Sequence, residues 1–557
     1  MDANTLSELT IADVYHLPIV KEYARQINLV ATVNSLVDTE MDLDPGTAVL
    51  AMVLDTLSGR TPLYRLKEFF ENKDTELLLG KPVDHEIFTD YNIGRVLDKI
   101  YETGTHKIFS QLSQNAIGGF QINTKAVHYD TTSISVFGDY DYQDPPLEIT
   151  YGHSKDKRPD LKQFMVELLC VDRNIPLFGA TRDGNSSDKT LNNELLGSVS
   201  TYMAKHGLDP NAYVYVADAA FTTKKNIIKA HKEQVDFISR LPASYNACSE
   251  VIEQAVRADN WTDIGTLATT EPTDKRPAAF YRYFETELDL HDIAHRAIVV
   301  HSSAHDKRRH KRIDRLLAKK QTELENACKK AAEKSFFCAS DAQQAAETLC
   351  ATADKSGYHS IETTIAEVAR YKPGRPANGQ PRVPERFEYV LETRVIEEPE
   401  KIKPLRKQAG CFVLITNLTS PEEQDEWTGV KLLKSYKEQI GVEQNFGFLK
   451  DPAIVNSIFL KKPKRIEVLG LILIIALLLW RLMERSLRQY VQPENKTLPG
   501  WKKLQTKRPT SFMMSTKFHS IIIVTSATQR HFARPLNPVQ LEYLKALNVS
   551  PDVFTSP

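Results

Sequence analysis

The sequence predicts an α/β fold in which a mixed sheet follows a helical N-terminal region and is interrupted by a large α+β insertion. Apolar residues recur at helical spacing through residues 1–115, and alternating, β-branched sequence replaces them from residue 122. Three expected strands are then followed by helix–strand–helix–strand order up to residue 244. This order is typical of a mixed α/β sheet.

The N-terminal region, residues 1–115, is expected to form a compact helical module. The segment "LPIVKEYARQINLVATVNSLV" has apolar residues at helical spacing, and "LDPGTAVLAMVLDTLSG" has an Asp-Pro start and ends on Gly59. Such a module is compatible with a helix-turn-helix-like domain that binds DNA ends. It is equally compatible with a helical bundle that has no such role.

Two segments, residues 120–244 and 406–485, are expected to build the α/β core. The first holds strands within residues 122–142, 147–188, 212–221 and 236–241, and helices at 191–207 and 223–234. The second opens on the strand "GCFVLITNL" and contains the apolar run Val468–Trp480. That run has thirteen residues, fewer than the roughly eighteen of a membrane-spanning helix. We therefore expect a buried core helix and no membrane partner.

The insertion, residues 245–405, interrupts this order with a different pattern. It contains the strand-like segments "AAFYRYFETELD" and "HRAIVVHSS", a charged helix over residues 306–334, and a loop rich in Pro and Gly. Residues 486–557 read as a C-terminal region of short helices with Pro-rich joins.

Composition restricts the function only weakly. Of the 557 residues, 41% are hydrophobic and 26% are charged, and the formal net charge of −1 neither indicates nor excludes nucleic acid. The start "MDANTLSELTIADVYH" is polar and does not resemble a secretory leader. The six cysteines are dispersed, without a Cys-x-x-Cys pair, which favours reduced thiols in a cytoplasmic protein and argues against a zinc site.

Three acidic residues stand out because each falls on a core element. Asp130 lies inside an apolar strand, Asp218 ends the strand "YVYVAD", and Glu443 lies on the helix after the last strand. If they converge at one end of the sheet, they offer hard oxygen ligands for Mg²⁺ or Mn²⁺, and two such ions suit phosphoryl transfer. The alternative is that each acid is separately a cap, a surface charge or half of a salt bridge.

The segment "SYKEQIGVEQNFGFLKD", residues 435–451, is expected to be a helix with a polar stripe. Tyr436, Gln439, Glu443 and Lys450 are separated by offsets of three, seven and fourteen from the first, which return to nearly one helix face. A polar inner face indicates a DNA or metal contact. A solvated helix face would show the same pattern.

The order Asp, Asp, long insertion, Glu resembles the DDE transposases of bacterial and archaeal insertion sequences. More closely, it resembles the group named for insertion sequence four, whose signature spaces Tyr, Arg, Glu and Lys as Tyr436, Gln439, Glu443 and Lys450 are spaced here. "HYDTTS", "GHSKDKRPDLKQF", "DGNSSD" and "VADAAF" also resemble the branch with a helical N-terminal domain. The resemblance covers residues 10 to about 545.

The resemblance implies an RNase H-like core that cuts and pastes DNA, with a hairpin at the transposon end. Asp130, Asp218 and Glu443 would hold two Mg²⁺ or Mn²⁺ ions, while Tyr436 and Lys450 would contact phosphates of the transposon end. One position departs from the signature, because the family's Arg is Gln439 here. A glutamine donates only neutral hydrogen bonds, so Lys437 is a candidate for the missing phosphate contact.

Local basic clusters supply further DNA-binding candidates. Arg308 and Arg312 lie in "HDKRRHKRIDRLLAKK", and Lys462 and Lys464 lie in "KKPKRIE", just after the polar helix. Arg375, in "YKPGRPANG", resembles a Gly-Arg-Pro hook for a narrow minor groove. For the first cluster a solvated helix, and for Arg375 an ordinary turn, explains the sequence as well.

The expected partners are the terminal inverted repeats and a target duplex, bound by a homodimer that pairs two ends. The expected location is the nucleoid of a bacterium or archaeon. Two alternatives stay open: a related metal-dependent nuclease without strand transfer, and an inactive, transposase-derived DNA-binding protein, for which Gln439 is the hint.

Overall fold

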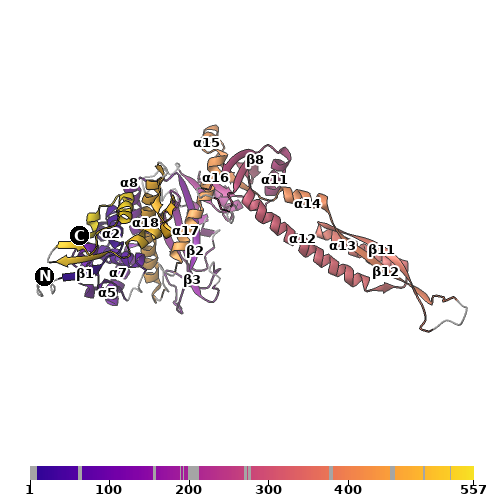
Figure 1. Cartoon of the computed structure of the whole chain (residues 1–557), viewed down its shortest axis with the longest axis horizontal. Helices are drawn as coiled ribbons and strands as arrows, with labels where there is room; N and C mark the ends of the chain where they lie inside the picture. Colours follow the sequence, from indigo (N-terminus) through magenta and orange to yellow (C-terminus); the bar gives the residue numbers. More distant parts are fainter. Residues whose placement is uncertain are drawn as a thin grey trace. The chain divides into compact units, whose positions relative to one another are not determined.

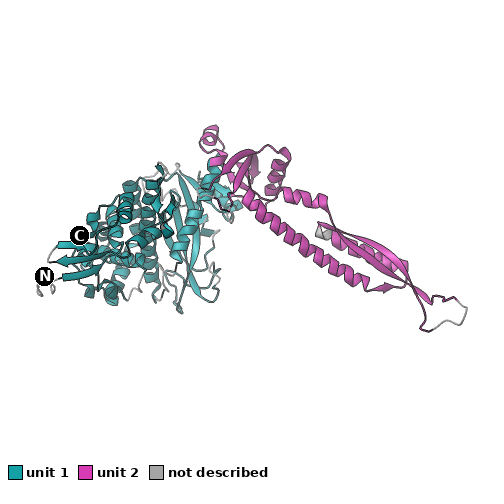
Figure 2. Cartoon of the chain, in the orientation of Figure 1, with its two compact units in different colours: residues 1–239, 416–418, 431–557 teal, residues 240–415, 419–430 magenta. Residues whose placement is uncertain are grey.

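The computed structural model describes residues 9–557 except 60–64, 155–157, 188–189, 192, 198–212, 269–271, 274–276, 375–380, 452–457, 459, 494–495 and 527–528. The chain forms two compact units (Figure 2). Unit 1 contains residues 1–239, 416–418 and 431–557, and unit 2 contains residues 240–415 and 419–430. The N-terminal helices and the α/β core therefore belong to the same unit.

The sheet of unit 1 confirms the predicted fold class, a mixed α/β core. Its strands follow the order β4-β3-β2-β5-β6, where β2 pairs antiparallel with β3, β3 pairs antiparallel with β4, and β2–β5 and β5–β6 are parallel. The strands are β2 (Ala126–Val136), β3 (Lys162–Val171), β4 (Ile175–Arg182), β5 (Val214–Ala217) and β6 (Asp236–Arg240). Part of the helix expected at 191–207 lies outside the described residues.

The helices of unit 1 begin where the sequence places capping residues. Asp44 accepts the N–H of Thr47 at the start of α4, and Thr89 accepts the N–H of Asn92 at the start of α7. The helices are α2 (Leu17–Gln26), α3 (Leu29–Leu36), α4 (Pro45–Leu57), α5 (Leu66–Phe70), α6 (Thr75–Leu79), α7 (Asp90–Thr103), α8 (Thr105–Phe120), α10 (Lys224–Lys232), α16 (Gly429–Glu438), α17 (Ile440–Leu449), α18 (Pro463–Val491), α19 (Ser511–Phe518) and α20 (Pro538–Leu547).

Helix α18 is the central helix of unit 1 and contacts α4, α7, α8, α20 and β4 (Figure 1). It spans 29 residues and is long and apolar enough to cross a membrane by length and composition, whereas the sequence predicted a shorter run. Its apolar window is 94% buried inside the protein. It therefore packs as a core helix.

Three strands of unit 1 were not predicted. β1 (Leu9–Asp13) pairs antiparallel with β16 (Ile522–Ser526), which pairs in turn with β17 (Gln529–Phe532). The expectation of helices alone in residues 1–115 and in 486–557 was wrong here. The reason is that β1 obtains its hydrogen bonds from a strand at the far end of the chain, which local periodicity does not reveal. The unit also contains the two-residue strands β14 (Leu498–Pro499) and β15 (Gln505–Thr506).

Unit 2 combines a small sheet with a long helical and β-hairpin arm. Its sheet follows the order β13-β9-β8-β7, and its second sheet the order β10-β12-β11. Strands β11 and β12 pair in register from His359↔Glu397 to Arg370↔Arg386, and the Pro- and Gly-rich segment connects them. The elements are α11 (Asn246–Ala258), β7 (Thr262–Thr266), β8 (Phe280–Leu290), β9 (Ile293–Ser302), α12 (Ser303–Ala332), β10 (Ser335–Phe336), α13 (Ala339–Ser356), β11 (His359–Arg370), β12 (Arg386–Glu397), α14 (Pro399–Lys407), β13 (Cys411–Thr416) and α15 (Pro421–Glu426).

Candidate active site

Asp130 and Asp218 lie on neighbouring parallel strands of unit 1. The register pairs His128 of β2 with Val216 of β5, so two residues further along both strands Asp130 stands level with Asp218, just past the end of β5. Because side chains alternate between the faces of a sheet, both carboxylates belong to one face. They also lie where β5 ends, the edge at which α/β sheets place functional groups.

The electrostatics of Tyr215 support the closeness of the two acids. Burial raises the pKa of this phenol well above its usual range, and Asp218 and then Asp130 raise the pKa further through their negative charge. Asp130 is half-buried and Asp218 is exposed. Oδ1 of Asp130 accepts the N–H of Thr131 at 2.8 Å, and Oδ1 of Asp218 accepts the N–H of Ala220 at 2.9 Å.

The predicted polar helix, residues 435–451, is two helices that meet at Gln439. α16 ends at Glu438, α17 begins at Ile440, and Gln439 between them keeps helical backbone angles (φ −53°, ψ −25°). Tyr436 is half-buried and Lys437 exposed near the end of α16. Glu443 lies exposed in the first turn of α17, and Lys450 is its C-cap.

A buried polar network holds α17 against the sheet face that carries Asp130. Asn445 Nδ2 donates to the Asn174 carbonyl at 2.9 Å and lies 3.2 Å from Cys170 Sγ, and Cys170 stands opposite His128 in the β2–β3 register. From α18, Arg481 Nε donates to Asn445 Oδ1 at 2.7 Å. These hydrogen bonds fix the position of α17 along the direction of the strands.

The first turn of α17, which carries Glu443, lies beside the turn between β3 and β4. The described residues contain no group of three or more His, Cys, Asp or Glu side chains placed to hold a metal ion. Gly441 packs so closely on the Arg173 carbonyl that an added Cβ would lie 2.3 Å from it, so α17 begins beside the β3–β4 turn, before the level of Asp130. The convergence of Glu443 with Asp130 and Asp218 therefore stays a prediction.

The carboxylates of Asp130 and Asp218 are of the chemical type that binds a divalent cation, but they are only two of the three expected ligands. Asp130 and Asp218 are hard oxygen donors on one face, which is what Mg²⁺ or Mn²⁺ takes from a protein. Glu443, as a third ligand, stays a prediction.

His128 lies on the same face as Asp130, in the centre of the sheet. Burial lowers its pKa to about 4, and within the described part of the chain neither ring nitrogen has a hydrogen-bond partner. The folded protein therefore holds His128 as a neutral imidazole. This is a structural position in the core of the sheet.

We expect His128 to make the protein less stable in acid. Its folded-state pKa lies below the unfolded value of 6.5. The free energy of unfolding is therefore not reduced by His128 above pH about 6.5, and it decreases as the pH falls toward 4. The loss amounts to about 1.4 kcal/mol per pH unit in this window. Urea unfolding at several pH values should show a shallower pH dependence for His128→Leu than for wild type. His153→Gln, at an exposed position, is the control, and equal slopes for both variants would contradict this assignment.

The other DNA-binding candidates are scattered over both units. Lys462 is exposed, and Lys464 pairs with Asp98 at 3.3 Å, so part of its charge is used within unit 1. Arg308 and Arg312 are exposed on α12 of unit 2. Arg375 lies outside the described residues.

Sequence reasoning missed Asn445 and Arg481, which position α17. Arg481 directly follows the apolar run Val468–Trp480. A signal was present, because an arginine at the end of such a run within a continuing helix must find a buried partner. One partner, Glu484, lies three residues away, but the two partners on α17 are 36 and 37 residues away in sequence, so the sequence does not identify them.

The fold is a mixed α/β sheet that brings Asp130 and Asp218 to one candidate metal-binding face. Residues 9–114 match a family described as a domain of unknown function, DUF4277. Among solved structures, the chain is similar to a piggyBac transposase synaptic complex with hairpin DNA, at 9% identity and a TM-score of 0.36, over 83% of this chain and 74% of that chain. No curated protein matches the chain. The structural likeness is too distant to carry a functional inference.

Proposed function

We propose that the chain is a DNA transposase that cleaves transposon ends and joins them to target DNA in a metal-dependent reaction. The observation that carries this proposal is that Asp130 of β2 lies level with Asp218, just past the end of the neighbouring parallel strand β5. The spacing of Tyr436, Gln439, Glu443 and Lys450 supports it. The protein would act in the nucleoid as a homodimer on terminal inverted repeats.

The reaction consists of two phosphoryl transfers. Water attacks a phosphodiester at the transposon end, the bond to the 3′ oxygen breaks, and a 3′-hydroxyl and a 5′-phosphate result. That hydroxyl then attacks a target phosphodiester and releases a target 3′-hydroxyl, or first attacks the opposite strand to form a hairpin. Bound divalent cations supply activation of the attacking oxygen and stabilisation of the leaving oxygen.

The protein's own residues orient these groups. Asp130 and Asp218 would hold the cation from the sheet, and Glu443 would complete the site from α17 if the segment around Gln439 adjusts when DNA binds. Tyr436, Lys437 and Lys450 would contact phosphates of the transposon end, with Lys437 supplying the positive charge that Gln439 lacks.

The test is cleavage of a supercoiled plasmid that carries the element's own two ends, with Mg²⁺. We expect cleavage at the ends by wild type and by the control Glu102→Gln, whose carboxylate is exposed on α7, and none by Glu443→Gln. EDTA should abolish all cleavage. Cleavage by Glu443→Gln at the wild-type rate would remove Glu443 from the site.

One observation favours a second candidate, an inactive DNA-binding descendant of a transposase. The described residues include no group of three or more His, Cys, Asp or Glu side chains that could hold a metal ion, and Gln439 replaces the family's arginine. Specific end binding without cleavage by wild type would establish this alternative. A nuclease without strand transfer would cleave but would not join a pre-cut 3′-hydroxyl end to a second duplex.

Gln439→Arg is expected to raise the affinity of the protein for the transposon end. A guanidinium makes charged, bidentate bonds to phosphate where the amide makes neutral ones, so end affinity should rise about tenfold. Fluorescence anisotropy with a labelled end measures this. Gln444→Arg, exposed on α17, is the control for added charge, and an equal rise in both variants would argue against a specific phosphate contact at residue 439.

A further inference from the structure

Unit 2 contains a pocket of about 420 Å³ that the proposed reaction does not use. Its walls come from α11, α12, α14 and the start of β13. The apolar part of the lining includes Ile313, Leu316 and Leu405. Leu316 is 39% exposed, so an apolar surface is open at this pocket.

Three arginines line the same pocket, namely Arg240, Arg309 and Arg312. Among the described lining residues none is acidic. Arg309, Arg312 and Leu316 lie three and four residues apart on α12, so they share one helix face. The pocket therefore combines guanidinium groups with an apolar wall.

The pKa of the neighbouring His305 indicates a positive electrostatic potential at this pocket. The pKa of His305 is lowered to about 4, first by burial and then by charge repulsion from Arg309 and Arg240. Arg240 lies over the ring of Phe412, 5.2 Å from the ring centre. This contact holds one guanidinium in place beside the pocket.

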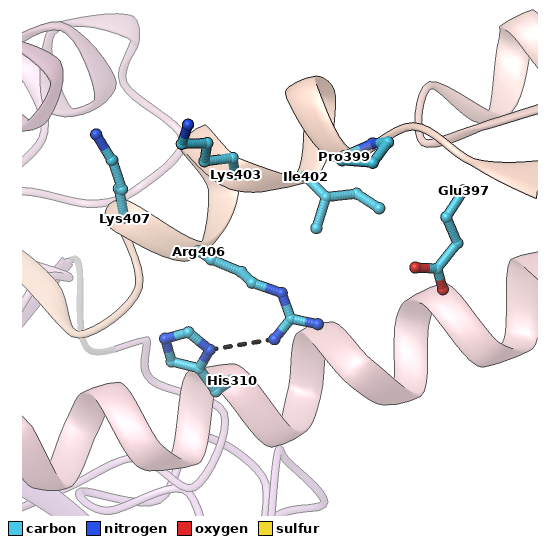
Figure 3. A pocket seen from close by; sticks show the side chains of 7 residues that line it. All are labelled: His310, Glu397, Pro399, Ile402, Lys403, Arg406 and Lys407. Atoms are coloured by element: carbon cyan, nitrogen blue, oxygen red, sulfur yellow. Dashed lines mark hydrogen bonds between the residues drawn. The ribbon is translucent and has the colours of Figure 1, made fainter.

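An adjacent pocket of about 520 Å³ shows the contrasting case (Figure 3). It also contains cationic side chains from α14, and Arg406 reaches His310 of α12 at 3.3 Å. Its charges are balanced by carboxylates, because Arg406 pairs with Asp314 at 2.8 Å and His310 lies 3.1 Å from Asp306. Glu397 also lines it. The arginine-lined pocket has no such acidic lining among its described residues.

We propose that the pocket lined by Arg240, Arg309 and Arg312 binds a phosphate ester. Guanidinium groups bind phosphate oxygens through paired, charged hydrogen bonds, and the apolar wall takes the organic part of the ligand. A free nucleotide and a DNA strand both carry this chemistry. The proposal goes beyond the transposition reaction, since it needs neither a metal ion nor cleavage.

The experiment measures binding by the full-length protein in EDTA, so that metal chemistry does not contribute. The ligands are deoxyadenosine monophosphate and a labelled single-stranded oligonucleotide, each tested by titration with wild type and two double variants. The pocket variant is Arg309→Gln with Arg312→Gln. The control is Lys311→Gln with Arg315→Gln, which removes the same charge from exposed positions of α12 outside the pocket lining. Circular dichroism verifies that all three proteins are folded.

We expect the pocket variant to lose at least about tenfold in affinity and the control to lose about twofold. Saturable binding of the mononucleotide, lost in the pocket variant, identifies a free nucleotide as a ligand. Loss of oligonucleotide binding alone identifies a DNA strand. If both double variants bind both ligands equally well, or if wild type binds neither, the proposal is overturned. None of these binding results bears on the proposed cleavage of transposon ends, which is tested separately.

Discussion

Replacing Asp130 by asparagine is expected to reduce Mg²⁺-dependent end cleavage by at least about a thousandfold. A cation ligand contributes several kcal/mol of transition-state stabilisation, and each 1.4 kcal/mol or so corresponds to a factor of ten. Asparagine keeps the shape of the side chain, and its Oδ1 still accepts the N–H of Thr131. Folding and end binding in EDTA should therefore stay near wild type. Asp218→Asn should behave in the same way.

Asp160→Asn is the matched control for Asp130→Asn. Asp160 is exposed in the same unit and pairs with Arg158 at 2.7 Å on the surface, so the change removes one carboxylate without approaching the sheet face. We expect its cleavage rate to stay within about twofold of wild type. A cleavage rate for Asp130→Asn that equals that of Asp160→Asn would show that this aspartate is not part of the reaction.

Arg481→Met is expected to lower the free energy of unfolding by about 3 kcal/mol. The Arg481 side chain is 7% exposed and pairs with Glu484, which is 4% exposed, at 3.2 Å. Methionine fills a similar volume but leaves Asn445 Oδ1 without this donor and Glu484 with less positive charge around it. Breaking one partner out of a buried ionic network costs several kcal/mol. Urea unfolding measures the difference.

The surface pair Arg25–Glu22 provides the control for this change. The Arg25 side chain is 70% exposed, so Arg25→Met should cost no more than about 1 kcal/mol. Arg481→Met should in addition lower the cleavage rate at a temperature where it is fully folded, because α17 loses its link to α18. Equal stability of the two methionine variants would contradict the role of the network.

The sequence predicts those elements whose stability comes from local pattern and burial. Strands β2, β3 and β4 are largely buried and rich in β-branched or apolar residues, and Asp44 and Gly59 bound α4 as expected. β1 could not be predicted in this way, because its partner β16 lies more than five hundred residues away. The hairpin β11–β12 was missed for a different reason: its strands alternate between half-buried and exposed residues, which gives a weak signal.

In the candidate site, too, local pattern predicts some features, whereas others depend on contacts between residues far apart in sequence. The places of Asp130 inside one strand and of Asp218 at the end of another were predictable from the local pattern of the sequence. The position of Glu443 relative to them was not. It depends on Asn445, Arg481 and the tight approach of Gly441 to Arg173, which are contacts between residues far apart in sequence.

The most direct test of the metal-dependent account is anomalous X-ray diffraction at the manganese edge from crystals of the protein bound to its own transposon end and Mn²⁺. The account predicts a manganese peak between the carboxylates of Asp130 and Asp218, with Glu443 brought within coordination distance. A well-ordered DNA complex without manganese at these two aspartates would contradict it.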